Sequence, residues 1–179
     1  RATDGAAFEM VIMRYRERVT ACISSQVGCP VACAFCATGQ GGFERNLTTA
    51  EIVDQVRLAA ALVADEGRRL SNLVYMGMGE PLLNYEATWA SVMRLTDPEG
   101  FAMGSRRITI STAGVVPGIR RLAGESLQIG LAVSLHAPND SLRTKLVPLN
   151  RRYPIEDLMD AVRYYVLQTG RRVTFEYAL

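Results

Sequence analysis

Three cysteines stand close together near the start of the chain, at Cys29, Cys33 and Cys36. Three and then two residues separate them, and three thiolates with this spacing on one loop can each bind one iron of a 4Fe-4S cubane. The fourth iron is then left without a protein ligand, much as a catalytic zinc site keeps an open position. An open iron can chelate a small molecule through amine and carboxylate groups. The spacing therefore predicts a catalytic cluster that holds a ligand.

Structural zinc and an electron-transfer cluster are the alternatives for these cysteines. Both need a fourth ligand, and ferredoxin cysteines follow one another at a spacing of two residues, whereas the first gap here has three. Cys22 could complete such a site, but it lies seven residues before Cys29 in a predicted strand, and the one histidine is His136. The catalytic cluster is the favoured interpretation.

Small and polar residues follow three further predicted strands at the points where the strands end. They read MGMGEP at residues 76–81, STAG at 111–114 and SLHAP at 134–138. The carboxyl ends of parallel strands are where α/β sheets and barrels assemble their active sites. Because the cysteine loop also follows a strand, four successive strands direct candidate chemistry to one rim.

Alternating strands and helices must position these motifs. Residues 8–13 and 19–27 predict an N-terminal β-hairpin, and an N-cap signal at Thr48 with helical apolar spacing predicts a helix that ends near Gly67. The later strands are expected at 70–76, 107–112, 129–135 and 173–177, and the later helices at 85–95, 115–123 and 155–168. This alternation implies right-handed crossovers and a mainly parallel sheet, open or closed into a barrel.

The ends and the composition of the chain bear on its context. The 179 residues begin at Arg1 rather than at Met and stop at Leu179 within a strand-like run, so we expect an internal piece of a longer protein. No apolar run approaches the roughly 20 residues that span a bilayer, and no signal-peptide pattern is present. Four cysteines crowded into residues 22–36 suit a metal site in a reducing compartment. These features predict a cytoplasmic protein with no membrane partner.

Charge says little about partners. The net charge of +2 does not indicate a nucleic-acid-binding protein, although Lys145 is the one lysine and arginine recurs in pairs. Arginine binds phosphate bidentately and stacks on bases, which suits RNA. The base composition of the genome explains the arginine bias equally well, so both explanations stay open.

Four stretches carry a resemblance to known enzymes. The run CPVACAFC at residues 29–36, with an aromatic residue before the last cysteine, resembles the signature of the radical S-adenosylmethionine (SAM) superfamily. SSQVGC at 24–29, MGMGEPLLN at 76–84 and SLHAP at 134–138 resemble, more narrowly, the RlmN/Cfr group of RNA adenine methyltransferases. The resemblance runs through nearly the whole chain. It implies a partial (β/α) TIM-like barrel of the radical SAM type, truncated before its last strand, with a hairpin extension over residues 1–21 and a core over 22–179.

The resemblance also implies roles for individual residues. The three loop cysteines correspond to the ligands of one 4Fe-4S cluster. Gly79 and Glu80 correspond to the stretch that meets the amino end of SAM, where a carboxylate suits an ammonium and a glycine lets the backbone come close. Cys22 corresponds to a cysteine that resolves a protein–RNA adduct and can form a disulfide with a methyl-carrying cysteine, and Glu9 to a proton acceptor. Further SAM contacts correspond to Ser111, Ser134, Leu135 and His136.

Ordinary structural roles stay open for several of these residues. Glu80 and its neighbouring glycines also fit a tight turn, and Ser111 and Ser134 fit strand-end caps. Cys22 could be a small buried strand residue and Glu9 a strand residue that faces solvent. A lone histidine is often structural, although the position of His136 at a strand end favours a ligand contact.

The reaction implied by the resemblance consumes two SAM molecules per turnover. The first methylates a cysteine near the C-terminus of the proteins of this family, beyond Leu179. A radical from the second removes a hydrogen atom from that methyl group, which then adds to adenine. The implied substrates are carbon 2 of an adenine in 23S rRNA and tRNA, with a reducing donor such as flavodoxin or ferredoxin. The N-terminal RNA-binding helices of the family and one SAM-contacting Asn have no counterpart here.

Three other functions stay open at this point. The nearest methylates carbon 8 of the same ribosomal adenine, which confers antibiotic resistance. The second is another radical SAM activase or small-molecule enzyme, and the third is a metal-binding module without catalysis.

Overall fold

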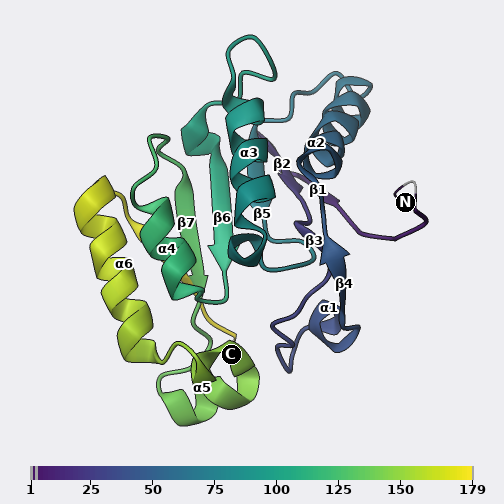
Figure 1. Cartoon of the computed structure of the whole chain (residues 1–179). Coiled ribbons are helices and arrows are strands. Elements are labelled where there is room, and N and C mark those ends of the chain that lie inside the picture. The colour runs from purple at the N-terminus through teal and green to yellow at the C-terminus, as the bar shows by residue number, and fades with distance from the viewer. Residues whose placement is uncertain (1, 3, 179) are drawn as a thin grey trace.

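A six-stranded sheet forms the centre of the computed structural model, which describes residue 2 and residues 4–178 (Figure 1). The strand order is β1-β2-β5-β6-β7-β8, in which β1 pairs antiparallel with β2 and all later pairs are parallel. The strands are β1 Val11–Arg14, β2 Val19–Cys22, β5 Asn72–Tyr75, β6 Ile108–Thr112, β7 Gly130–Ser134 and β8 Val173–Glu176. The predicted hairpin and mainly parallel sheet are therefore confirmed. Over the described ranges the sheet is open, with β1 and β8 at its two edges.

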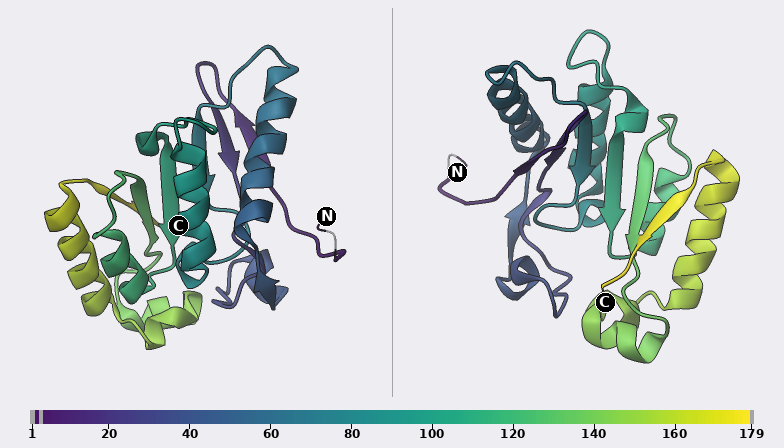
Figure 2. Two further views of the ribbon diagram at one scale, coloured as in Figure 1. Left: turned by 45° about the horizontal axis from the view of Figure 1, so that its top comes forward. Right: turned by 180° about the vertical axis from the view of Figure 1, so that it is seen from behind.

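Four helices cover one face of this sheet. They are α2 Thr49–Ala64, α3 Tyr85–Thr96, α4 Val116–Leu122 and α6 Ile155–Thr169. Seen from behind, the strands of the coloured ribbon are in full view with no helix before them (Figure 2). The core lies between the helices and the sheet, where Ile52, Val92 and Leu158 are fully buried. None of these helices, nor any other in the described chain, combines the length and apolarity needed to cross a lipid bilayer.

Side-chain alternation along the strands decides which residues face away from the helices. Leu73, Ile110 and Leu131 are buried beneath the helices, and strand residues one position away point to the opposite face. Registered partners share a face, so this alternation extends across the sheet. The residues that it places on the uncovered face include Cys22, Ser111, Ser134 and Glu176.

The predicted helix after Thr48 forms with its expected start. The Thr48 side chain accepts a hydrogen bond from the Glu51 amide, and the Glu51 carboxylate accepts one from the Thr48 amide. These two bonds satisfy backbone N–H groups that the first helical turn leaves free. At the other end of the fold, α6 terminates on Gly170 in the left-handed conformation, which glycine adopts without strain.

The prediction of one strand over residues 19–27 is wrong, because these residues form two strands that belong to two different sheets. β2 ends at Cys22, and β3 Gln26–Gly28 pairs instead with β4 Phe43–Asn46. Between them, the Ser24 amide donates to the Gln55 side chain and the Ser25 amide to the Met78 carbonyl. These partners draw the backbone out of the main sheet.

Several short elements, which show no clear apolar period in the sequence, were missed. They are β4, the helices α1 Ala37–Gln40 and α5 Asp140–Leu146, and the 3-10 turns η1 Pro81–Leu83, η2 Ser105–Arg107 and η3 Pro148–Arg151. The division into a hairpin extension and a core stays a prediction. Its boundary falls at the end of β2, a strand that pairs with both β1 and β5.

Candidate active site

The carboxyl ends of the parallel strands surround a hollow of about 330 Å³. Its walls come from the cysteine loop and from the segments that follow β5, β6 and β7, as the strand-end motifs predict. Of the predicted site residues, eight line this hollow: Cys29, Cys33, Cys36, Gly79, Glu80, Ser111, Ser134 and His136. Residues up to 107 positions apart in the chain thus meet at one place.

Backbone hydrogen bonds fix the cysteine loop at both sides. The Cys29 amide donates to the carbonyl of Gly42, the residue before β4, over 2.8 Å. The Ala34 amide donates to the Leu146 carbonyl over 2.9 Å, which ties the loop to the end of α5. The three thiols are half-buried and free. The loop is thereby held between two elements that are distant in sequence.

Replacing Gly28 by alanine should disturb the cysteine loop directly. Gly28 has φ +74°, and a Cβ there would lie 2.0 Å from the Gly42 carbonyl oxygen, the acceptor of the Cys29 amide. The backbone conformation alone costs about 1–3 kcal/mol for a residue other than glycine. We expect a larger loss than this in the free energy of unfolding, measured by urea denaturation.

Gly42→Ala is the matched control for this substitution. Gly42 has φ +84°, but a Cβ there meets nothing within 4 Å. It should therefore cost only the conformational strain. Equal losses for the two variants would contradict the assigned clash.

The charges around the three thiols suit a cationic metal centre. Burial, together with the negative charges of Cys29, Cys36 and Glu80, raises the pKa of Cys33 to about 12, while Arg143 opposes them. Burial also raises the pKa of Cys29. Coordination to a metal deprotonates a thiol outright, so bound iron would reverse these shifts. In the described chain, no three His, Cys, Asp or Glu side chains gather around a single ion position. The cysteine ligands of a cubane are not expected to do so, because each of them binds a different iron.

Glu80 is a buried carboxylate at the wall of the hollow. Its Oε1 accepts from the Leu82 amide over 3.0 Å and its Oε2 from the Ala113 amide over 2.6 Å. Burial raises the pKa of Glu80 to about 7, although these hydrogen bonds favour the carboxylate. The group can still accept from a ligand, because each carboxylate oxygen has a second lone pair. The structure therefore gives Glu80 both a structural role and a place at the hollow.

The glycine before Glu80 is needed for packing. Gly79 has φ +101°, and a Cβ there would lie 2.6 Å from the Cβ of Gln26. The Gln26 side chain accepts from the Glu80 amide over 2.8 Å. Because Gly79 has no side chain, Gln26 can pack against it and hold the turn through the Glu80 amide.

Glu176 lies between the two predicted serines, and sequence reasoning missed it. Its Oε2 accepts from the Ser111 hydroxyl over 3.0 Å and from the Ser134 hydroxyl over 2.8 Å. With their protons committed to Glu176, both serines present lone pairs to a ligand. One signal could have found it: Glu176 ends β8 and so follows the rule that placed the other strand-end motifs on this rim.

His136 stands at the edge of the hollow in a left-handed backbone conformation, with φ 58°. Its Nδ1 accepts from the Ala178 amide over 3.1 Å, and its ring meets the ring of Phe35 edge to face with centroids 4.7 Å apart. Burial lowers the pKa of His136, which favours the neutral ring. Leu135 is different, because its side chain packs against the core while its amide donates to the Glu176 carbonyl. The structure thus brings His136, but not the Leu135 side chain, to the hollow.

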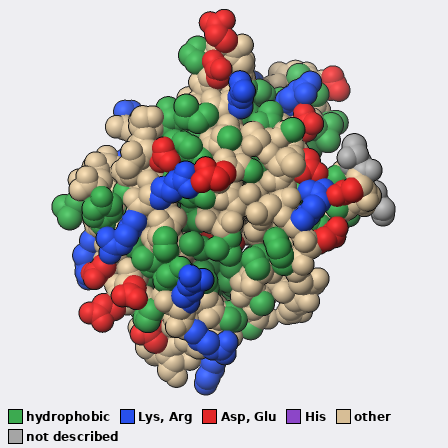
Figure 3. All heavy atoms as spheres, viewed as in Figure 1, with side chains coloured by type: hydrophobic (Ala, Val, Ile, Leu, Met, Phe, Trp, Pro, Cys, Tyr) green, Lys and Arg blue, Asp and Glu red, His purple; other side chains and the backbone are tan. Residues whose placement is uncertain are grey.

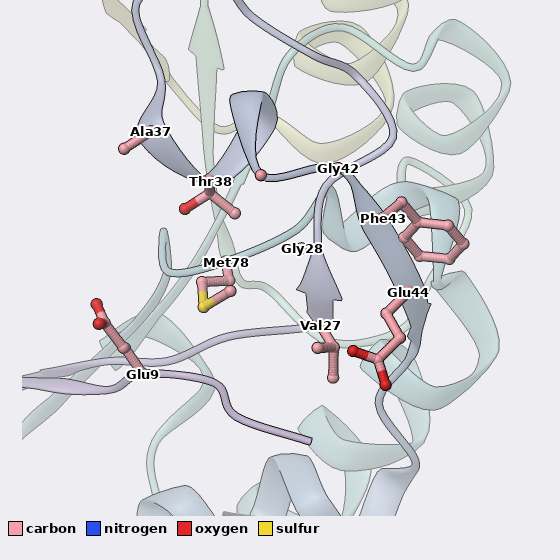
Figure 4. A pocket seen from close by; sticks show the side chains of 10 residues that line it. Glu9, Val27, Gly28, Ala37, Thr38, Gly42, Phe43, Glu44 and Met78 are labelled. Carbon is pink, nitrogen blue, oxygen red and sulfur yellow. The ribbon is translucent and has the colours of Figure 1, made fainter. Parts of the chain in front are cut away.

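Glu9 and Cys22 are not among the residues that line this hollow. Glu9 is exposed and lines a neighbouring hollow of about 430 Å³ with Phe43, Glu44 and Met78 (Figure 4). The turn of residues 76–79 separates the two hollows, because Met78 lines one and Gly77 and Gly79 the other.

Cys22 is a half-buried free thiol on the uncovered face of the sheet. Burial raises its pKa, and the charge of Glu176 raises it further. All four cysteines fall within the described residues and all are free, so no disulfide joins Cys22 to the loop.

Comparison with known proteins gives the same family from three directions. The model of the radical SAM superfamily matches residues 23–177. A probable dual-specificity RNA methyltransferase RlmN of Mycolicibacterium vanbaalenii is 57% identical over all of this chain and 50% of its own length. That of Corynebacterium glutamicum is 56% identical over 98% of this chain and 49% of its own length. The chain spans about half the length of these curated relatives.

A solved structure is also similar. A radical SAM methyltransferase from Sphaerobacter thermophilus superposes with a TM-score of 0.99 and is 59% identical, over 100% of this chain and 52% of that one.

Proposed function

The chain belongs to the radical SAM superfamily, and from this premise we propose that it is the catalytic core of an enzyme that methylates carbon 2 of an adenine in 23S rRNA and in tRNA. The observation that carries the proposal is the hollow at the strand ends, where three thiols and the buried Glu80 carboxylate come together. The similarity of the chain to probable dual-specificity RNA methyltransferases supports RNA as the substrate class.

The residues of the hollow divide the binding of the cofactors among them. Cys29, Cys33 and Cys36 would hold one 4Fe-4S cluster and leave one iron for the amine and carboxylate of SAM. When bound, the cluster supplies the electron that cleaves SAM to a 5′-deoxyadenosyl radical. Glu80 would accept a hydrogen bond from the iron-bound amino group of SAM, for which a buried carboxylate is a strong partner. Ser111, Ser134, the Leu135 backbone and His136 contact the rest of SAM.

The remaining residues serve the transfer itself. Cys22 resolves the adduct between protein and RNA, together with a methyl-carrying cysteine that lies outside this sequence. Glu9 lines the hollow that adjoins the cysteine loop. It acts as the proton acceptor of the transfer reaction. Two SAM molecules are consumed per turnover, and a low-potential donor such as flavodoxin or ferredoxin supplies the electron in a reducing cytoplasm.

Mass spectrometry of digested RNA tests this function. A strain that lacks the gene should lose 2-methyladenosine from 23S rRNA and tRNA, and the full-length protein should restore it. Loss of 8-methyladenosine from the deletion strain, and its restoration by the full-length protein, would instead assign the carbon 8 reaction.

Two other outcomes would point away from RNA methylation altogether. An unchanged RNA pool, together with 5′-deoxyadenosine formed from SAM, would favour an activase or a small-molecule enzyme. Failure of the reduced, reconstituted full-length protein to form 5′-deoxyadenosine would favour a metal-binding module.

A further inference from the structure

Arg143 is an arginine whose burial demands an explanation. It lies on α5 with 0% of its surface exposed and is the largest fully buried side chain among the described residues. Taking a guanidinium out of water costs several kcal/mol. An apolar side chain of similar size would avoid this cost. We therefore expect Arg143 to have a role that requires its charge.

Neutral oxygens, rather than a carboxylate, accept the hydrogen bonds that the structure gives Arg143. Its Nε donates to the Leu135 carbonyl over 3.1 Å, and its Nη2 donates to the carbonyls of Ala113 and Ser134 over 2.6 and 3.1 Å. Its Nη1 donates to the Asn150 side chain over 2.8 Å. Because these partners carry no formal charge, they orient the guanidinium without neutralising it.

The position of Arg143 is behind the cysteine loop. Ala113 and Ser134, whose carbonyls it binds, line the hollow together with the three cysteines. The last residue of its own helix, Leu146, accepts the hydrogen bond of Ala34 within the cysteine loop. The acidic side chains at this hollow are Glu80 and Glu176, and the three cysteines become thiolates when they bind a metal. A fixed positive charge at Arg143 offsets these negative charges.

We propose that Arg143 is a positioning residue for the cluster, whose buried positive charge raises the reduction potential of iron bound by Cys29, Cys33 and Cys36. This inference rests on the proposed function only in requiring that the loop holds a 4Fe-4S cluster. Reduction adds one electron from a low-potential donor and no proton. Burial lowers the pKa of Arg143, but a guanidinium is not deprotonated in proteins, so Arg143 stays protonated throughout. A nearby cation favours the reduced cluster, since net charge is one of the factors that set such potentials.

The exposed acid next to Arg143 offers a way to cancel its charge without removing it. Asp140 accepts from the Ile155 amide and from Asn150 Nδ2, each over 2.9 Å, and Asn150 in turn accepts from Arg143. Exchanging the two residues, as Asp140→Asn with Asn150→Asp, keeps the net charge and lets an amide donate to a carboxylate as before. It moves the negative charge onto the guanidinium.

The test is a redox titration of the reconstituted full-length protein without SAM or RNA, followed by electron paramagnetic resonance, with dithionite as the reductant. Arg143→Gln and the Asp140/Asn150 exchange should each lower the equilibrium constant for reduction at least tenfold, which is about 59 mV for one electron. Arg143→Lys, which keeps the charge, should stay within about threefold of the unsubstituted protein. Arg163→Gln is the control, because it removes an equal charge from the exposed face of α6 and should leave the potential unchanged.

The outcomes separate charge from structure. If Arg143 served only to tie the strand ends together, the exchange would strengthen its bonding and leave the potential as it was, which would overturn the proposal. Should Arg143→Gln fail to fold, the exchange and Arg143→Lys still decide the matter. The titration involves no RNA, so an error in the assigned substrate would leave its result untouched.

Discussion

Replacing any one of Cys29, Cys33 and Cys36 by serine is expected to remove the cluster and with it the cleavage of SAM. Each of the three thiols lines the hollow, and each would bind a different iron, so no neighbour can substitute for it. Losing a hydrogen-bond partner of a metal ligand already lowers metal affinity or activity roughly 10–100-fold, and losing the ligand itself should lower it further. Iron content, the visible absorbance of the reconstituted full-length protein and the yield of 5′-deoxyadenosine would measure the loss.

Cys22→Ser is the matched control for these substitutions. Cys22 is half-buried on β2 and does not line the hollow. Its replacement should leave the iron content unchanged. A loss of iron in this variant would mean that Cys22 completes a four-cysteine site, and would support the zinc or electron-transfer alternatives over a cluster with an open iron.

Replacing Glu80 by glutamine is expected to weaken SAM binding by roughly 10–100-fold, because a hydrogen bond to a charged group contributes about 1.5–3 kcal/mol. The side chain of Glu80 is almost completely buried, and glutamine keeps its size while removing the negative charge that would strengthen a hydrogen bond from the SAM amino group. Equilibrium binding of SAM to the reconstituted full-length protein would measure the change. Glu86→Gln, at a carboxylate on the exposed surface of α3, should leave the affinity unchanged.

The pH dependence of SAM binding follows from the same carboxylate. Burial raises the pKa of Glu80 to about 7, well above its ordinary value of 4.5. In wild type the SAM amino group meets a carboxylate acceptor above pH 7 and a neutral acid below it, so affinity should fall as the pH drops through about 7. The Glu80→Gln variant should lack this transition. An identical pH profile in the two proteins would assign the SAM amino group to another partner.

Folding stability should change with pH in the opposite sense. A raised pKa means that the folded protein binds the Glu80 proton more tightly than the unfolded chain does. The stability linked to that proton is fully present below pH 4.5 and is lost as the pH rises through about 7. Glutamine remains neutral, so Glu80→Gln should flatten this part of the stability curve, as urea denaturation at several pH values would reveal.

The surface shows why charge alone gave little guidance about partners. Lys and Arg side chains are scattered over the face viewed in Figure 3 and alternate with acidic ones. Several arginines of the protein are already paired with carboxylates, as Arg121 is with Glu86 and Arg163 with Asp160. The repeated arginine pairs of the sequence therefore do not by themselves mark an RNA-binding surface.

The sequence by itself determined the parts of this protein that depend on short spacings. Cys29, Cys33 and Cys36 are close along the chain, so their spacing alone predicts one loop with three iron ligands. The alternation of strands and helices determined a parallel sheet, and a parallel sheet brings its carboxyl ends to one edge whatever the side chains are. That rule is enough to bring Glu80, Ser111 and Ser134 to the same rim, because each of them follows or ends a parallel strand.

Only the tertiary structure decided the contacts between residues that are distant in the chain. Glu176 accepts from Ser111, 65 positions before it, and Arg143 reaches the Ala113 carbonyl across 30 positions. Neither contact leaves a periodic or local pattern, because each depends on how strands and helices pack. The same is true of Glu9, which the packing places in a neighbouring hollow, and of residues 24–25, which Gln55 and Met78 draw out of the sheet. Local spacing thus predicted which cysteines could bind iron, whereas packing defined the charges that surround them.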